Sequence, residues 1–195
     1  SAANTYFALE QFMTEKREEM ALSDSGDPLL LTPGPLTTSL EVKQAMLHDL
    51  GSRDPGFINL SKDICKSILS LCNGESSHSC IPVQGSGTFA VEAMIGTLLP
   101  AKGKCLNLVN GAYGRRISEI CHYLGRDYLE IKNAENQQLD PQAVKKHLAK
   151  NKDITHVCLV YCETTSGILN PLQEIADIVA EEGRILLVDG MSAFG

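Results

Sequence analysis

Two hydrophobic patterns alternate along the second half of the chain: short unbroken apolar runs, and longer segments with helical periodicity. The runs HVCLVYC and ILLVDG are typical of strands that are covered on both faces of a sheet. Together the patterns predict strands at residues 80–83, 105–109, 128–131, 156–161 and 185–188, and helices at 88–98, 114–124, 140–150 and 171–182. Repeated units of this kind predict an α/β fold with a mostly parallel sheet and helices on both faces.

The first part of the chain is less regular and is interrupted by breakers. Residues 5–22 have helical character and end at a polar segment that is rich in serine, aspartate and glycine. We therefore interpret residues 1–27 as a leader or linker helix, and residues 28–195 as part of one domain.

The segment after this leader predicts two further helices. Thr32-Pro33-Gly34-Pro35 predicts a rigid, non-helical stretch whose backbone stays accessible. Thr38 or Ser39 is then expected to cap a helix whose apolar side extends to Leu50. A second helix is expected over residues 58–71.

Composition and charge narrow the classes of partner. A chain of 195 residues, 43% hydrophobic and 21% charged, is ordinary for a globular protein with room for a core. The net charge of −7 argues against broad binding to nucleic acid, and no apolar run is long enough to cross a bilayer. The seven cysteines form no C-x-x-C pair, which predicts reduced thiols in a cytoplasmic protein and no metal site.

One short turn carries the first indication of function. Gln84-Gly85-Ser86-Gly87-Thr88 opens a predicted helix, whose first N–H groups and dipole favour an anion. Ser86 and Thr88 add hydroxyls, and the two glycines allow a close approach of the backbone. The turn therefore predicts a phosphate site, although an ordinary strand–helix loop with a good N-cap explains it equally well.

Other polar residues follow the remaining strands, and parallel strands bring their carboxyl ends to one edge of the sheet. They include Tyr113 between two glycines, Thr165 in a hydroxyl-rich loop, and Asp189 at the end of an apolar strand. A dinucleotide site is one explanation, because residues 85–90 match G-x-G-x-x-A. However, the acidic residue expected about 20 residues later is absent.

A pyridine cofactor explains more of these residues. Pyridoxal phosphate requires a phosphate cradle, an aromatic side chain against its ring and a carboxylate on its ring nitrogen. Asp189 suits the last role, because a buried aspartate needs a cationic partner and a protonated pyridine supplies one. The alternative for Asp189 is capping of a following helix, and for Tyr113 it is a loop aromatic that covers the core.

Six ordered motifs resemble the class V aminotransferases of fold type I. They are Leu30-Leu31-Thr32-Pro33-Gly34-Pro35, Ser52-Arg53-Asp54-Pro55, Gln84-Gly85-Ser86-Gly87-Thr88, Asn110-Gly111-Ala112-Tyr113-Gly114, Glu163-Thr164-Thr165-Ser166-Gly167 and Val188-Asp189-Gly190-Met191-Ser192. The resemblance covers the chain from about Pro28 onward. It implies pyridoxal phosphate as cofactor and a homodimer. In the members most similar to this chain, it implies amino transfer from 2-aminoethylphosphonate to pyruvate, giving phosphonoacetaldehyde and alanine.

The resemblance also implies roles for individual residues. Those it places on the cofactor are Ser86, Gly87 and Thr88 at the phosphate, Tyr113 on the ring face, Thr165 near the ring hydroxyl and Asp189 at the ring nitrogen. Those it places toward the substrate are Gly34, through its backbone, and Thr38 and Arg53 as contacts for a substrate anion.

Family members also carry, beyond the aspartate strand, a lysine that forms a Schiff base with the cofactor, and no lysine of this chain occupies that place. We therefore expect a fragment of the large domain that is inactive alone and self-associates through an exposed sheet edge. Two alternatives stay open. One is an aminotransferase of the serine or alanine–glyoxylate type, and the other is a lysine-less module that binds the cofactor or a partner without catalysis.

Overall fold

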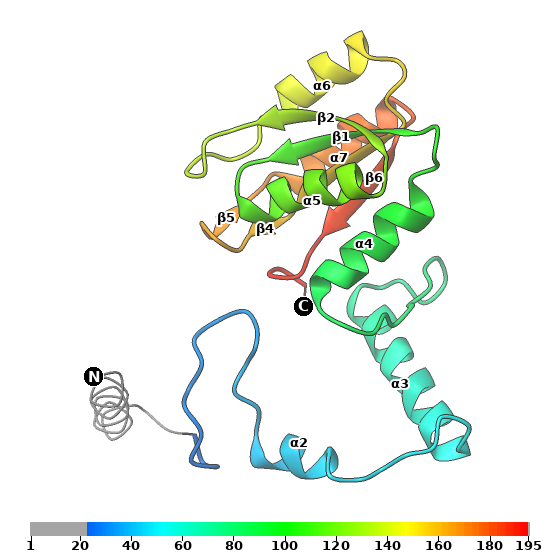
Figure 1. Cartoon of the computed structure of the whole chain (residues 1–195), viewed down its shortest axis with the longest axis vertical. Coiled ribbons are helices and arrows are strands. Elements are labelled where there is room, and N and C mark those ends of the chain that lie inside the picture. The colour runs from blue at the N-terminus through cyan, green and yellow to red at the C-terminus, as the bar shows by residue number, and fades with distance from the viewer. Residues whose placement is uncertain (1–22, 195) are drawn as a thin grey trace, which may run out of the picture. The chain divides into compact units, whose positions relative to one another are not determined.

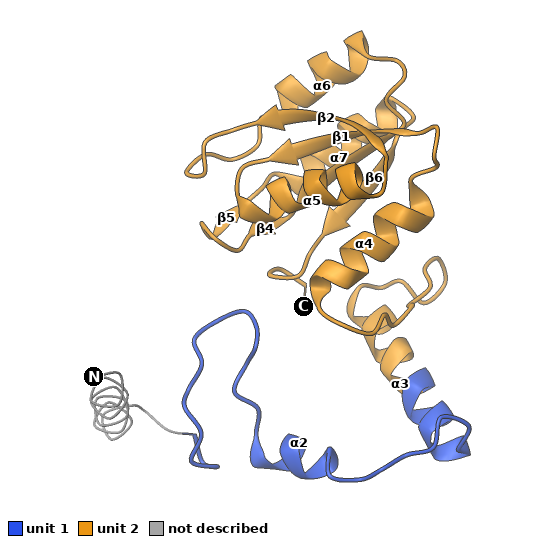
Figure 2. Cartoon of the chain, viewed as in Figure 1, with its two compact units in different colours: residues 1–62 blue, residues 63–195 orange. Residues whose placement is uncertain are grey.

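The chain divides into two compact units, residues 1–62 and 63–195, of which the computed structural model describes residues 23–194 (Figure 2). The boundary between the units lies within helix α3 (Pro55–Leu71). The helix predicted over residues 5–22 lies outside the described residues. Within residues 23–194, every helix is too short or too polar to span a bilayer.

In the described part of the first unit, residues 23–62, side-chain hydrogen bonds connect the loops and the helix α2 (Leu40–Ala45). Ser39 caps this short helix, because its hydroxyl accepts the N–H of Val42. The hydroxyl of Thr37 accepts the N–H of Leu30 at 2.8 Å and donates to the carbonyl of Pro28 at 2.6 Å. The helix α2 is shorter than predicted, since the apolar residues after Ala45 form a turn and a loop.

A four-stranded parallel sheet forms the centre of the second unit, with the strand order β2-β1-β3-β6 (Figure 1). The strands are β1 (Lys104–Val109), β2 (Asp127–Lys132), β3 (His156–Val160) and β6 (Ile185–Asp189). In the register of this sheet Asn107 lies opposite Cys158, and Val160 lies opposite Asp189. Because the strands are parallel, the residues that follow them gather at one edge, as predicted.

Helices cover both faces of the sheet, which confirms the predicted α/β architecture. The helices α4 (Gly87–Leu98) and α5 (Ala112–Tyr123) pack on one face, and α6 (Pro141–Lys150) and α7 (Leu172–Glu181) pack on the other (Figure 1). Successive residues of β1 point to opposite cores: Cys105 joins the core under α4 and α5, and Leu106 joins the core under α6 and α7. All five residues of β3 are buried, which explains its unbroken apolar run.

The predicted strand at residues 80–83 is wrong. These residues are extended coil, and the side chain of Ile81 is 79% exposed. A strand requires a neighbour to share its backbone hydrogen bonds, and none of the described strands pairs with this segment. The β-branched residues of this segment therefore favour a strand locally, but no neighbouring strand is there to pair with it.

A small hairpin follows β3 and was not predicted. Its strands β4 (Cys162–Glu163) and β5 (Ile168–Leu169) pair antiparallel, and each is only two residues long. Gly167 adopts a φ of +72° in its turn, and its N–H donates to the Glu163 carbonyl at 2.7 Å. The hairpin fixes the loop that carries Thr165 beside the carboxyl end of β3.

Two buried asparagines, Asn110 and Asn170, form hydrogen bonds at the carboxyl edge of the sheet. The side-chain amides of Asn110 and Asn170 donate to each other's oxygens at 2.9 and 3.2 Å. Asn170 also donates to the Val160 carbonyl at 2.8 Å and accepts the N–H of Leu139 at 3.1 Å. The ends of β1 and β3 and the loop before α6 are therefore joined by hydrogen bonds through this pair.

Candidate functional site

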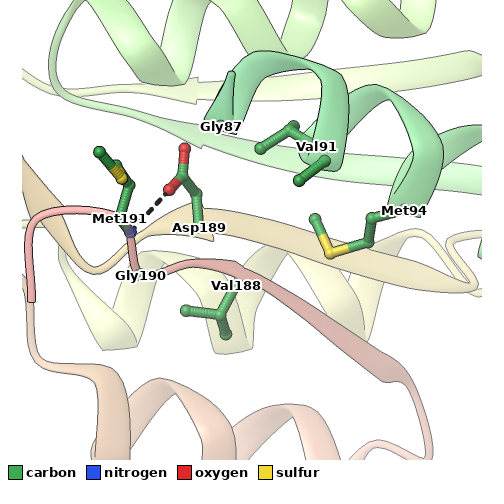
Figure 3. Close-up of a pocket in the computed structure, with 8 residues that line it drawn as sticks. Gly87, Val91, Met94, Val188, Asp189, Gly190 and Met191 are labelled. Carbon is green, nitrogen blue, oxygen red and sulfur yellow. Dashed lines mark hydrogen bonds between the residues drawn. The ribbon is translucent and has the colours of Figure 1, made fainter. Parts of the chain in front are cut away.

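A pocket opens where the start of α4 lies against the end of β6 (Figure 3). It has a volume of about 260 Å³, and its lining consists of Gly87, Ala90, Val91, Met94, Val188, Asp189, Gly190 and Met191. Most of this lining is apolar, and Asp189 supplies the one charged side chain. The fold thus brings Gly87 and Asp189, two residues predicted to contact a cofactor, to one cavity.

The N-terminus of α4 has the features of an anion site. Ser86 occupies the N-cap position in extended conformation, but its hydroxyl makes no capping hydrogen bond. The first turn of α4 carries no acidic residue, and the exposed backbone of Gly87 starts the helix. The cap that would make the turn an ordinary strand–helix loop is therefore missing, and the Ser86 hydroxyl is free for a ligand.

Gly85 sets the shape of this turn. Its φ is +113°, which side chains rarely tolerate, and a β-carbon there would lie 2.6 Å from Cδ2 of Phe89. The backbone must therefore bend sharply at residue 85 to present the start of α4.

Tyr113 lies in the first turn of α5 rather than in a loop. Its ring is half-buried against the core under α4 and α5. Tyr113 therefore covers part of the core, which is the alternative that the sequence left open. The guanidinium carbon of Arg116 lies 5.0 Å from the centre of the same ring. One Nη1–H of Arg116 also donates to the Thr88 hydroxyl at 3.2 Å, which links Tyr113 to the start of α4.

Glu163 is the site residue to which sequence analysis assigned no role. Its side chain is fully buried, and its carboxylate lies at the N-terminus of α5, where it accepts the N–H groups of Tyr113 and Gly114, each at 3.2 Å. The Thr165 hydroxyl donates to the same carboxylate at 2.9 Å. Glu163 therefore joins two predicted cofactor residues, Tyr113 and Thr165. The sequence feature that could have indicated this close approach was Gly111, because a side chain at position 111 would overlap Glu163.

Asp189 is half-buried rather than buried. Its Oδ1 accepts the N–H of Met191 at 3.0 Å, so the carboxylate orders the turn after β6. Residues 191–193 form a turn rather than a helix, so the helix-capping alternative stays a prediction. In Figure 3 the carboxylate points toward the start of α4. No lysine, arginine or histidine of residues 23–194 forms an ion pair with it.

The buried thiol of Cys158, which lies on the strand next to the one that carries Asp189, stays protonated. Burial, followed by the charges of Cys121 and Asp189, raises the pKa of Cys158. All seven cysteines, which lie in the described part of the chain, are free thiols. The Cys158 thiol is therefore neutral.

The predicted substrate contacts lie in the first unit. Gly34, Thr38 and Arg53 are exposed, and Thr38 lines a hollow of about 430 Å³ together with Ser39 and residues of the preceding segment. Their roles toward a substrate stay predictions.

Comparison with known proteins identifies relatives that match most of this chain. The family model "Aminotransferase class-V" matches residues 43–195. A 2-aminoethylphosphonate–pyruvate transaminase of Pseudomonas putida strain F1 is 53% identical over 171 residues, which is 88% of this chain and 46% of the relative. The enzyme of that name from Pseudomonas aeruginosa is 51% identical over 86% of this chain and 45% of its own length. The chain thus spans about half the length of these curated relatives.

Solved structures agree with the sequence comparison. Pyridoxamine–pyruvate aminotransferase from Mesorhizobium loti superposes with a TM-score of 0.78 at 29% identity, covering 90% of this chain and 45% of that one. An alanine–glyoxylate aminotransferase from Nostoc gives a TM-score of 0.79 at 28% identity, covering 91% and 48%. The match of the family model over most of the sequence, together with these relatives, shows that the chain belongs to the class V aminotransferase family.

Proposed function

We propose that the chain supplies the cofactor-binding part of a pyridoxal-phosphate-dependent aminotransferase that transfers the amino group of 2-aminoethylphosphonate to pyruvate. The observation that carries the proposal is the shared pocket of Gly87 and Asp189, 102 residues apart in the sequence. The pocket combines the N-terminus of α4, which lacks a side-chain cap, with a carboxylate that has no ion-pair partner among residues 23–194. The helix N-terminus suits a phosphate, and the carboxylate suits a basic nitrogen. Pyridoxal phosphate carries both groups.

When bound, pyridoxal phosphate supplies a ring that accepts the electron pair released from the amino donor. The chain's own residues hold and orient it. The Ser86 hydroxyl, the Thr88 hydroxyl and the first N–H groups of α4 would bind the phosphate. Asp189 would hold a proton on the ring nitrogen, because a carboxylate stabilises the cation beside it. The apolar side chains of Val91, Met94 and Met191 would keep water from the ring.

Tyr113 and Thr165 would complete the site from the other strand ends. Tyr113 would cover the ring face, and the Thr165 hydroxyl, which already donates to Glu163, retains lone pairs that can accept from a ligand. Glu163 positions both residues without contacting a ligand itself. The products of the transfer would be phosphonoacetaldehyde and alanine.

None of the eight residues that line the pocket carries an amine. Transamination needs such an amine as a proton carrier at the reacting carbon. We therefore expect no transaminase turnover from this chain by itself. A rate above that of free pyridoxal phosphate would contradict this expectation.

Cofactor binding by the chain is the direct test. The chain is titrated with pyridoxal phosphate and binding is followed by absorbance and calorimetry. We expect Gly87→Val to block the start of α4 and Asp189→Asn to weaken binding. Asp177→Asn on α7, on the opposite face of the sheet, is the matched control and should bind as the wild type does. A folded wild-type chain that binds no pyridoxal phosphate would overturn the cofactor assignment, and equal affinities of the two asparagine variants would remove Asp189 from it.

The amino donor is tested in a protein that joins this chain to the remaining half of its relatives. Aminoethylphosphonate, serine and alanine are compared as donors, with pyruvate and glyoxylate as acceptors. The name and 53% identity of the Pseudomonas putida relative favour aminoethylphosphonate over the serine or alanine–glyoxylate alternative. A clear preference for alanine and glyoxylate would favour that alternative. Cofactor binding without turnover for any donor would favour a module that binds the cofactor without catalysis.

A further inference from the structure

We propose that Arg116 is a positioning residue of the cofactor site, which directs the Thr88 hydroxyl toward the phosphate and fixes the ring of Tyr113. This inference rests on the proposed function. Arg116 lies on α5 and contacts both residues: Nη1 lies 3.2 Å from the Thr88 hydroxyl oxygen, and the guanidinium carbon lies 5.0 Å from the centre of the Tyr113 ring. Arg116 thus links the start of α4 to Tyr113.

The hydrogen bond to Thr88 determines where that hydroxyl can donate. A threonine hydroxyl has one proton and two lone pairs. The N–H of Arg116 occupies a lone pair, so the proton is left for an acceptor elsewhere. Thr88 is the second residue of α4, and the acceptor that suits a helix N-terminus is an anion. Arg116 thereby converts a freely rotating hydroxyl into a directed donor.

The contact with Tyr113 uses the same guanidinium. Tyr113 and Arg116 are three residues apart on α5, which places them on one face of the helix. A cation over an aromatic ring is attracted to its face and restrains the tilt of the ring. The contact with Arg116 therefore limits the orientations of the ring that a flat ligand can meet.

The charge of Arg116 remains available to the site. Its neighbour Arg115 forms an ion pair with Glu135 at 2.8 Å, whereas no carboxylate of residues 23–194 pairs with Arg116. The whole chain carries a net charge of −7, so an unneutralised guanidinium beside a helix N-terminus raises the potential for a dianion at that point. Lysine could supply the charge, but it lacks the planar fork that reaches a hydroxyl and covers a ring together.

The test compares three variants of the chain in their binding of pyridoxal phosphate and of pyridoxal, which lacks the phosphate. Arg116→Ala should weaken pyridoxal phosphate binding about tenfold, which is a typical step for a group that supports a charge-assisted contact. Its effect on pyridoxal should be smaller, so the preference for the phosphorylated ligand falls. Arg116→Lys should recover part of that preference. Arg115→Ala, which removes the same charge from the same turn of α5, should bind both ligands as the wild type does.

A second comparison separates a positioning role from a merely structural one. If Arg116 acts through the Thr88 hydroxyl, Arg116→Ala should lose most of its effect on phosphate preference in a Thr88→Val background. Circular dichroism verifies that each variant folds. Equal binding by the Arg116→Ala and Arg115→Ala variants would overturn the inference and leave the proposed function standing. Additive effects of Arg116→Ala and Thr88→Val would also overturn it. A wild-type chain that binds no pyridoxal phosphate would overturn the proposed function, and this inference with it.

Discussion

The buried carboxylate of Glu163 accepts the backbone N–H of Tyr113 at 3.2 Å, across 50 residues of sequence. The contact places a negative charge at the N-terminus of α5, where the helix dipole stabilises it. The same carboxylate holds the Thr165 hydroxyl. The relative position of Tyr113 and Thr165 therefore depends on one side chain that no ligand needs to touch.

Replacing Glu163 by glutamine should destabilise the chain although the side-chain shape is retained. The carboxylate accepts from three donors, and an amide would turn its NH₂ group toward at least one of them. A buried donor without an acceptor costs about 1–3 kcal/mol, so we expect the free energy of unfolding to fall by that amount. Urea denaturation measures it. Glu135→Gln, at an exposed ion pair with Arg115, is the control and should change stability by less than about 0.5 kcal/mol. An equal loss in both variants would contradict the structural role of Glu163.

Gly111→Ala should be destabilising for a steric reason. The φ of Gly111 is −180°, which alanine adopts without strain, but the added β-carbon would lie 2.2 Å from Cγ and Cδ of Glu163. Overpacking of this kind typically costs about 1–3 kcal/mol in the free energy of unfolding. The cost should shrink in a Glu163→Ala background, which a double-mutant cycle in urea detects. Gly190→Ala, where nothing lies within 4 Å of the added carbon, should be nearly neutral. An unchanged cost in the Glu163→Ala background would show that the overlap lies elsewhere.

Asn110 and Asn170 should behave as one unit. Asn170→Ala removes the hydrogen bonds that Asn170 makes to the Leu139 N–H and the Val160 carbonyl, and both of its bonds to Asn110. We expect a loss of about 2 kcal/mol or more in the free energy of unfolding. Because Asn110→Ala breaks the same pair, the double variant should cost less than the sum of the single ones, with a coupling energy of about 0.5–3 kcal/mol. Thermal and urea unfolding of the four proteins measure the coupling, and strict additivity would contradict it.

Much of the fold was predictable because its elements obey local rules. The continuous apolar run at His156–Val160 identifies a strand that is covered on both faces, and Asp140 followed by Pro141 marks a helix start that the structure confirms. The position of Asp189 at the end of an apolar strand was enough to expect it at the carboxyl edge of the sheet.

What the sequence did not reveal depends on contacts between distant residues. The apolar residues around Ile81 resemble a strand, but pairing requires a neighbour that local pattern cannot supply. Glu163 and Arg116 are polar residues of ordinary appearance until folding brings Tyr113 within reach of both. Gly111 indicated such a close approach, but not which side chain would make it.

The stability of the chain should depend on pH through His156. This histidine is buried on β3, its Nδ1 lies 2.7 Å from the Thr155 hydroxyl, and its Nε2 has no partner. Burial disfavours the charged imidazole and lowers the pKa of His156 below its ordinary value of 6.5, although the backbone of Leu98 partly opposes the shift. As the pH falls below 6.5, the unfolded chain therefore takes up this proton before the folded chain does.

The sign of the effect follows from this difference in proton uptake. The free energy of unfolding should rise with pH from the lowered pKa up to 6.5, and this contribution should be lost progressively as the pH falls through that window. His156→Gln, which keeps a polar side chain but cannot titrate, should flatten the slope just below pH 6.5 even if it shifts the overall stability. Urea unfolding at several pH values measures both slopes. Identical slopes for the wild type and the variant would mean that His156 takes up its proton equally in both states, despite its burial.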